Sequence, residues 1–249
     1  MTSISNIEQC FACDTGPLYF CENFLKILHT VHGIVPFWPY TYQKNYINAI
    51  SSQQHTVALM PRQFGKTLCS LAYLYWYALF NPNSRILVAT PNNNIAMCCI
   101  EKIKFFHKQL TEQLGIKISS CNKHSIDFEN GSIIIAKTIS ENLGRGMTLD
   151  IVFCDDFAFA KNASKFWQNI YPALQHTKII IASSYNTDKD MFFRIFSDAV
   201  NRFNFIPQVN QVKPFVVHWN EHPKKDIKWA IDQRTLLGTE VFHREYCFG

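Results

Sequence analysis

The sequence contains no apolar run long enough to cross a membrane. A transmembrane helix needs roughly 20 consecutive apolar residues, and no stretch of these 249 residues comes close. The segment from Met1 to Asp14 also lacks the basic region and apolar run of a secretory signal. Internal repeats and low-complexity linkers are missing as well. We therefore expect no membrane partner and a chain that folds as one domain.

Charge is also scarce. Only 17% of the residues are charged and 47% are apolar, which excludes a disordered chain and favours a large packed core. The 21 phenylalanines and 10 tyrosines should supply much of that core. The net charge of +5 permits a polyanionic partner such as nucleic acid but is too small to demonstrate one.

The nine cysteines are odd in number and scattered. Several stand inside apolar runs, where a cysteine behaves as a small buried hydrophobe: Cys69, Cys98 and Cys154. The pattern indicates a reducing compartment. A zinc site would have to draw on Cys10, Cys13, Cys21, His29 and His32. Their spacing is loose and falls in a helix-like stretch, so free thiols are the preferred interpretation.

Short β-rich runs alternate with helical patterns along most of the chain. Helices are expected at Leu18–His29, Tyr40–Ile50, Lys66–Phe80, Asn94–Leu114, Ala163–Ala173, Met191–Val200, Ile227–Leu237 and Val241–Tyr246. Strands are expected at Val57–Met60, Arg85–Ala89, Ile151–Cys154, Lys178–Ala182 and Phe215–Trp219. Two β-rich runs flank Asn130-Gly131, a strong hairpin signal. This order predicts an α/β fold, a mainly parallel sheet with helices on both faces and a β-hairpin insertion.

A phosphate-binding loop is predicted at Gly65-Lys66-Thr67, between a buried strand and a helix. Loop N–H groups and the positive end of the helix dipole would face an anion, Lys66 would reach the outer phosphates, and the Thr67 hydroxyl could hold magnesium. The match to G-x-x-x-x-G-K-[ST] is incomplete, because Met60 stands where the first glycine belongs. Taken alone, the motif leaves open whether a phosphate binds.

Two consecutive carboxylates, Asp155 and Asp156, follow the apolar strand at Ile151–Cys154. A phosphoryl-transfer ATPase needs one acidic group for magnesium and another to orient the attacking water. The alternative is an ordinary solvated turn, but the upstream Gly-Lys-Thr loop favours the functional interpretation. Arg62, inside the loop, could stabilise charge on the transferred phosphoryl group; otherwise it is a surface arginine paired with a carboxylate.

Together these segments resemble the Walker A, Walker B and coupling motifs of the viral large terminase subunit, the DNA-packaging motor of tailed bacteriophages and related viruses, and its T4-type members in particular. The three motifs are Arg62-Gln-Phe-Gly-Lys-Thr67, Ile151-Val-Phe-Cys-Asp-Asp-Phe-Ala-Phe159 and Ile179-Ile-Ile-Ala-Ser-Ser-Tyr-Asn186. Further segments extend the resemblance to nearly the whole chain: Leu18–Asn23, Trp38–Gln43, Phe128–Ser132, Leu143–Gly146 and Val217–Tyr246.

The resemblance implies a P-loop NTPase fold of the RecA/ASCE class and assigns roles by position. Residues 1–36 would be an N-terminal segment and helix packed on an ATPase domain of residues 37–249. Catalysis would use Asp156, Arg62 and Lys66. ATP would be bound by Gln43, Tyr42 (or Phe37 against the adenine ring), Pro61, Gln63, Phe64, Gly65, Lys66 and Thr67. Magnesium would be held by Thr67 and Asp155, coupling would involve Ser183, Ser184 and Asn186, and Arg145 would be a sensor or trans-acting arginine.

The same resemblance implies that Mg²⁺ and ATP are used to drive double-stranded DNA into a capsid. The expected partners are DNA, a portal protein, a small terminase subunit and further copies of the chain in a ring, inside the host cytoplasm or nucleus. The family's second Walker B acid is usually glutamate, whereas Asp156 is one methylene shorter, and no nuclease domain is expected in these residues. Two alternatives remain: a helicase-like translocase fragment of superfamily 2, and a nucleotide-binding assembly or DNA-binding protein with impaired hydrolysis.

Overall fold

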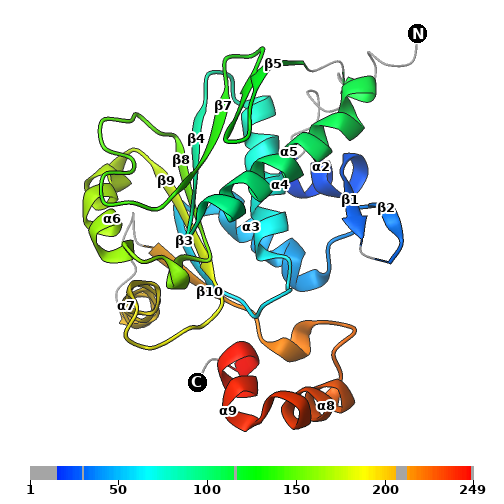
Figure 1. Ribbon diagram of the computed structural model, residues 1–249, viewed down its shortest axis with the longest axis vertical. Helices are drawn as coiled ribbons and strands as arrows, with labels where there is room; N and C mark the ends of the chain where they lie inside the picture. Colours follow the sequence, from blue (N-terminus) through cyan, green and yellow to red (C-terminus); the bar gives the residue numbers. More distant parts are fainter. Residues whose placement is uncertain (1–15, 30, 115–116, 206–211, 248–249) are drawn as a thin grey trace.

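The computed structural model describes residues 16–29, 31–114, 117–205 and 212–247. Its central sheet contains β3 (His55–Leu59), β4 (Arg85–Thr90), β5 (Ile118–Cys121), β6 (Ser125–Phe128), β7 (Ile133–Thr138), β8 (Ile151–Asp155), β9 (Lys178–Ser183) and β10 (Val212–Val216). The strand order is β10-β3-β9-β8-β4-β7-β6-β5 (Figure 1). Neighbours from β10 to β7 run parallel, and β6 and β5 add an antiparallel edge.

Helices cover both faces of this sheet (Figure 1). One face carries α2 (Pro17–Phe24), α3 (Thr41–Ser52), α4 (Lys66–Phe80) and α5 (Asn93–Leu114), and the other carries α6 (Ala163–Ile170) and α7 (Met191–Phe205). Side chains of a strand alternate between the faces, so Ala58 of β3 lies in one core while Val57 and Leu59 lie in the other. The predicted α/β fold, with its mainly parallel sheet, is confirmed.

Strand β9 lies between β3 and β8, so the ends of these three strands are adjacent. Leu59 of β3 is in register with Ser183 of β9, and Asp155 of β8 is in register with Ala182. Because the strands are parallel, their carboxyl ends meet at one edge of the sheet, where ligands of open α/β sheets bind. The loops that follow β3, β8 and β9 are therefore brought together there.

The predicted hairpin is formed by β6 and β7, and its turn is fastened to the end of α4. The Asn130 side-chain amide donates to the carbonyl oxygens of Ala78 and Leu79, at 2.8 and 3.1 Å. These carbonyls belong to the last turn of α4, which has no partners for them within the helix. The hairpin insertion thus caps the helix that begins at the phosphate loop.

Two predicted helices end earlier than expected. The helix expected over Leu18–His29 ends at Phe24, and β1 (Lys26–His29) instead pairs antiparallel with β2 (Gly33–Pro36), a hairpin that the helical spacing concealed. The helix at Ala163 ends at Ile170, because Pro172 lacks the N–H that a longer helix would need.

The last strand is β10 (Val212–Val216), displaced from the expected Phe215–Trp219. Its pairing with β3 explains the shift, since Val216 is in register with Leu59, the residue at which β3 ends. Residues 219–221 form a 3₁₀ turn instead.

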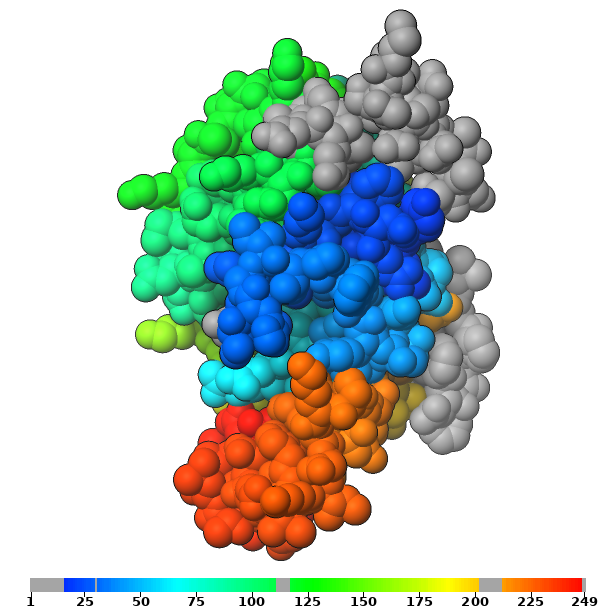
Figure 2. All heavy atoms as spheres, turned by 90° about the vertical axis from the view of Figure 1, so that its right-hand side faces the viewer, coloured from blue at the N-terminus to red at the C-terminus, as the bar shows by residue number. Residues whose placement is uncertain are grey.

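Residues 218–247 form a small helical lobe below the sheet, which we call the C-terminal lobe (Figures 1 and 2). It contains α8 (Ile227–Leu237), α9 (Thr239–Phe242) and a π-helical turn (His243–Cys247). Its interior is aromatic: the rings of Trp219, Trp229, Phe242 and Tyr246 contact one another. The lobe lies next to the sheet edge at which β3 ends, because β10 leads directly into it.

The described residues contain free thiols and no metal cluster. Their seven cysteines form no disulfide, and within the same ranges no group of three or more His, Cys, Asp or Glu side chains is placed to hold a metal ion. Cys10 and Cys13, the core of the zinc alternative, lie outside the described residues. None of the helices described here has the length and hydropathy needed to cross a membrane.

Candidate nucleotide-binding site

The loop between β3 and α4 has the backbone of a phosphate cradle. Gln63 and Gly65 both have positive φ values, 65° and 81°, and α4 starts at Lys66. The positive φ of Gly65 favours glycine, and a Cβ there would also lie 2.5 Å from Nε2 of Gln43, whose side chain would have to shift. The N-terminus of the 15-residue α4 adds partial positive charge beside the loop. Glycine is therefore favoured here, whereas Met60 at the first motif position is accommodated in the core.

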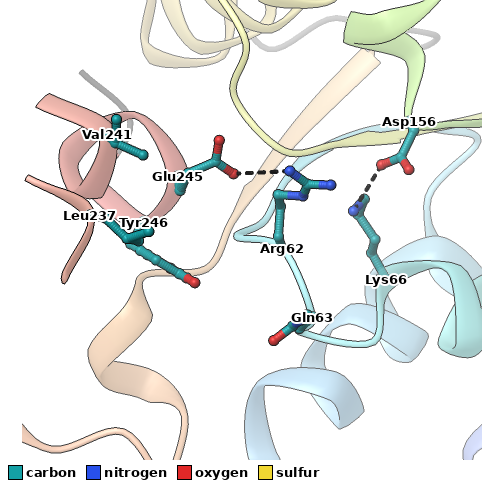
Figure 3. Close-up of a pocket in the computed structure, with 8 residues that line it drawn as sticks. All are labelled: Arg62, Gln63, Lys66, Asp156, Leu237, Val241, Glu245 and Tyr246. Atoms are coloured by element: carbon teal, nitrogen blue, oxygen red, sulfur yellow. Dashed lines mark ion pairs between the residues drawn. The ribbon is translucent and has the colours of Figure 1, made fainter. Parts of the chain in front are cut away.

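Lys66 and Asp156 form an ion pair across the site. The Lys66 Nζ lies 2.9 Å from Oδ1 of Asp156, and the Lys66 side chain is almost fully buried. Asp156 follows β8 with a left-handed backbone, φ 47°, a region that aspartate enters more easily than most residues. This turn directs the Asp156 carboxylate toward the lysine (Figure 3).

The Thr67 hydroxyl donates to the carboxylate of Asp155, 2.8 Å from Oδ1 and 2.9 Å from Oδ2. Asp155 is buried, and burial together with the neighbouring Asp156 raises its pKa to about 6, against the opposing effects of Lys66 and Thr67. A hydroxyl and a buried carboxylate short of positive charge fit Mg²⁺, which takes few protein ligands and completes its shell with water and phosphate oxygens. Thr67 and Asp155 would hold the ion.

A cavity of about 460 Å³ lies between the phosphate loop and the C-terminal lobe (Figure 3). The phosphate loop and the turn after β8 contribute Arg62, Gln63, Lys66 and Asp156, and the lobe contributes Leu237, Val241, Glu245 and Tyr246. Nη1 of Arg62 lies 3.7 Å from Oε2 of Glu245. Because Arg62 is 64% exposed, this pair contributes little stability and can exchange partners readily. Each cation of the loop thus faces a carboxylate across the cavity.

The residues expected at the adenine are covered by protein. Gln43 caps its own helix by accepting from the backbone N–H of Tyr40 at 3.0 Å, and its amide donates to the carbonyl of Phe64 at 3.1 Å. Tyr42 and Phe37 are each 2% exposed, and the Tyr42 ring packs on Phe64. The structure therefore places Gln43 and Tyr42 behind the loop, where they support Phe64.

Two of the residues predicted to take part in coupling fasten the turn that follows Asp156. Ser183 accepts from the N–H of Ala158 at 3.2 Å, and the Asn186 amide donates to the carbonyl of the same residue at 3.2 Å. Ser184 is buried, and its hydroxyl has no hydrogen-bond partner among the described residues. Ser183 and Asn186 thus hold the turn after β8 directly, and the Ser184 hydroxyl is left without a hydrogen bond among the described residues.

Arg145 does not line the cavity. It lies on the exposed loop between β7 and β8, and its guanidinium donates to the side chain of Asn142 at 3.1 Å. A role for Arg145 at another subunit's site stays a prediction.

The lobe residues Glu245 and Tyr246 were not assigned individual roles from the sequence. Both stand in a segment with helical spacing, where a glutamate and a tyrosine are ordinary surface and core residues. Only the chain path from β10 through the lobe brings them opposite Arg62.

The strand order, the loop and the paired acids define the additional-strand class of P-loop NTPases. A family model described as "Terminase large subunit, T4likevirus-type, N-terminal" matches residues 57–243. The chain belongs to this terminase large subunit family, as its resemblance implies.

Solved structures share the fold. The large terminase ATPase domain of Thermus phage P74-26 superposes with a TM-score of 0.68 at 16% identity, over 86% of this chain and 95% of that one. The large terminase of bacteriophage HK97 gives 0.66 at 13%, over 93% and 54%. The large terminase of a thermophilic bacteriophage, in complex with ADP, gives 0.64 at 11%, over 84% and 53%. The chain thus spans about half of the length of the last two proteins.

Proposed function

We propose that this chain is the ATP-hydrolysing domain of a viral DNA-packaging motor, using Mg²⁺ and ATP to move double-stranded DNA. One observation carries the proposal: Arg62, Lys66 and Asp156 line one cavity at the carboxyl edge of the sheet, and the hydrogen-bonded pair Thr67–Asp155 directly adjoins Lys66 and Asp156 in the chain. The complexes of the thermophilic bacteriophage's large terminase with ADP and with ATP-γ-S support a nucleotide ligand for this fold.

The ion pairs suggest how the site would change when ATP binds. Lys66 and Arg62 would exchange Asp156 and Glu245 for phosphate oxygens, which carry more charge and accept in several directions. Asp156, released from Lys66, would then orient the attacking water, and Arg62 would stabilise charge on the transferred group. Bound magnesium would neutralise charge on the phosphates. A nearby cation would favour the ionised form of Asp155, whose pKa is raised by burial.

The Walker B turn provides a route from hydrolysis to movement. A shift of Asp156 would pull on Ala158, which Ser183 and Asn186 hold. Asn186 also lines a second cavity, of about 440 Å³, together with Thr239, His243 and Arg244 of the C-terminal lobe. We propose that this contact transmits the state of the nucleotide to the lobe and to bound DNA, in a ring with further copies of the chain, a portal and a small subunit.

Single-turnover hydrolysis tests the proposal. Wild type, Lys66→Ala and the control Lys104→Ala, a partly exposed lysine paired with Glu101 on α5, are mixed with Mg²⁺ and limiting labelled ATP. We expect wild type and Lys104→Ala to hydrolyse ATP, and Lys66→Ala to be slower by about a hundredfold or more. A wild-type rate no faster than that of Lys66→Ala rejects an ATPase.

A second candidate function is a nucleotide-binding assembly protein with impaired turnover, favoured by the short acid at Asp156. It predicts that wild type binds ATP with magnesium but does not hydrolyse it.

Adding double-stranded or single-stranded DNA separates the motor from a helicase-like translocase. We expect the duplex to stimulate turnover more strongly.

A further inference from the structure

Lys225 of the C-terminal lobe lies in a cage of three aromatic rings, one of which belongs to the phosphate loop. Its Nζ is 4.6 Å from the ring centroid of Phe64, 4.2 Å from that of Trp229 and 4.9 Å from that of Tyr246. Trp229 stands on α8 and Tyr246 on the terminal π-helical turn. Each ring presents its face to the cation within the range of a cation–π interaction. The lysine therefore connects both parts of the lobe to the loop.

Phe64 is the point at which the loop is held from behind as well. The Phe64 side chain is fully buried, and its ring packs on Tyr42 at 5.4 Å and on His222 at 5.3 Å. Its carbonyl accepts from the Gln43 amide. Phe64 is also flanked by Gln63, whose positive φ is a conformation that a residue other than glycine keeps only where the surroundings hold it. Phe64 is thus held by contacts from α3 and from the C-terminal lobe.

The cage partly removes the Lys225 ammonium from solvent. Lys225 is half-buried, and its burial lowers the pKa of the ammonium group to about 8. The neighbouring Lys224 and Lys228 are exposed, as lysines usually are. The pair Arg62–Glu245 forms a separate link between the same loop and lobe.

We infer that Lys225 is a positioning residue for nucleotide binding: it ties the C-terminal lobe to Phe64 and so holds the phosphate loop in its binding conformation. The inference rests on the proposed function, and it extends that function to a residue outside the nucleotide motifs. Because linkage is reciprocal, nucleotide binding would in turn restrain the lobe.

The test compares Lys225→Met, which removes the charge and keeps the length, with Lys225→Arg, which keeps a cation that also stacks on aromatic faces. Lys228→Met is the matched control on α8. Affinity for a fluorescent ATP analogue with Mg²⁺ is measured by titration. We expect about tenfold weaker binding for Lys225→Met, partial rescue by Lys225→Arg, and wild-type affinity for Lys228→Met. Equal affinity of Lys225→Met and Lys228→Met would overturn the inference.

Hydrogen exchange supplies a readout that a merely structural lysine would not move. We expect the ATP analogue to slow exchange across residues 227–247 in wild type and in Lys228→Met, and to lose this effect in Lys225→Met at saturating analogue. Unchanged protection in Lys225→Met contradicts the linkage.

Thermal unfolding of a double-mutant cycle separates this inference from the proposed function. Lys225→Met is made in wild type and in Phe64→Leu, without nucleotide. If the cation and the ring interact, Lys225→Met lowers the midpoint by about 2–5 °C in wild type and by less than half as much in Phe64→Leu. Equal shifts reject the contact. A further outcome is that wild type binds no nucleotide even though the two substitutions are non-additive. That result rejects the proposed function and the role of Lys225 in binding, but it retains the contact between the lobe and the loop.

Discussion

The ionised form of Asp155 is unfavourable in the folded protein. Burial and the neighbouring Asp156 raise the pKa of Asp155 to about 6, above the value of an unfolded aspartate. Folding favours the protonated form of Asp155. The stability from this group is therefore fully present below about pH 4 and is lost as the pH rises through about 6.

Asp155→Asn, which keeps an acceptor for Thr67, should therefore stabilise the protein without metal at neutral pH. We expect a gain of roughly 1–3 kcal/mol at about pH 7.5 and about half of that at about pH 5, where the folded wild type is largely protonated but the unfolded aspartate is still ionised. Urea unfolding at both pH values, with excess chelator, measures this. A gain of the same size at both pH values would show that desolvation of the charge is not its cause. With Mg²⁺ and ATP, the same variant should lose activity.

The choice of aspartate at position 156 has a backbone reason. Its φ of 47° is left-handed, which costs a longer side chain more than it costs aspartate. The Asp156 side chain is nevertheless one methylene shorter than the glutamate that the terminase resemblance implies at this position.

Asp156→Glu should raise the single-turnover rate, by about threefold to tenfold, if reach limits water positioning, and lower stability by about 0.5–1 kcal/mol because of the backbone conformation. Asp156→Asn, which keeps the backbone preference but not the base, should lower the rate by about a hundredfold. A rate for Asp156→Glu at or below wild type would show that the shorter acid is not the limitation.

At the scale of elements, the β6–β7 hairpin supports the helix that begins at the phosphate loop. Asn130→Ala removes two hydrogen bonds to the last turn of α4 and should cost about 1–2 kcal/mol. Nucleotide affinity should be unchanged, because the cap lies at the far end of α4 from Lys66. Urea unfolding and nucleotide titration are compared with Asn94→Ala, an exposed position on α5. A loss of nucleotide affinity without a loss of stability in Asn130→Ala would contradict the expectation that the hairpin stabilises α4 without affecting nucleotide binding.

Elements with strong local signals were predictable, and elements fixed by pairing were not. The bounds of α4 and α8 were predicted as observed, since each has a clear helical period and a break at its end. The β1–β2 hairpin was missed, because Lys26–His29 continues the helical spacing of α2 and becomes a strand only through pairing with Gly33–Pro36. The bounds of β10 depend on β3 in the same way.

At the scale of the whole molecule, the net charge of +5 is mild, so the proposed DNA contact would depend on local phosphate-facing lysines and arginines. We expect stimulation of ATP turnover by double-stranded DNA to fall steeply between about 50 and 200 mM salt, because neutralised phosphates release counterions. Basal turnover should change much less over this range. Turnover assays across the salt series, with duplexes of unrelated sequence, test this. Stimulation that is insensitive to salt, or specific to one sequence, would contradict sequence-independent electrostatic contact.

The sequence by itself determined the class of the protein and the residues of its phosphate loop. Gly65, Lys66 and Thr67 act within one local turn, and the order of loop, paired acids and coupling segment is a property of the chain. Tertiary structure decided which groups face one another: Glu245 against Arg62, Lys225 against Phe64, and Gln43 behind the loop. These contacts join segments far apart in the chain through the order of strands β10, β3, β9 and β8. Local periodicity carries no information about that order, because each of these strands is a buried apolar run in the sequence, and such a run does not indicate which strand lies beside it.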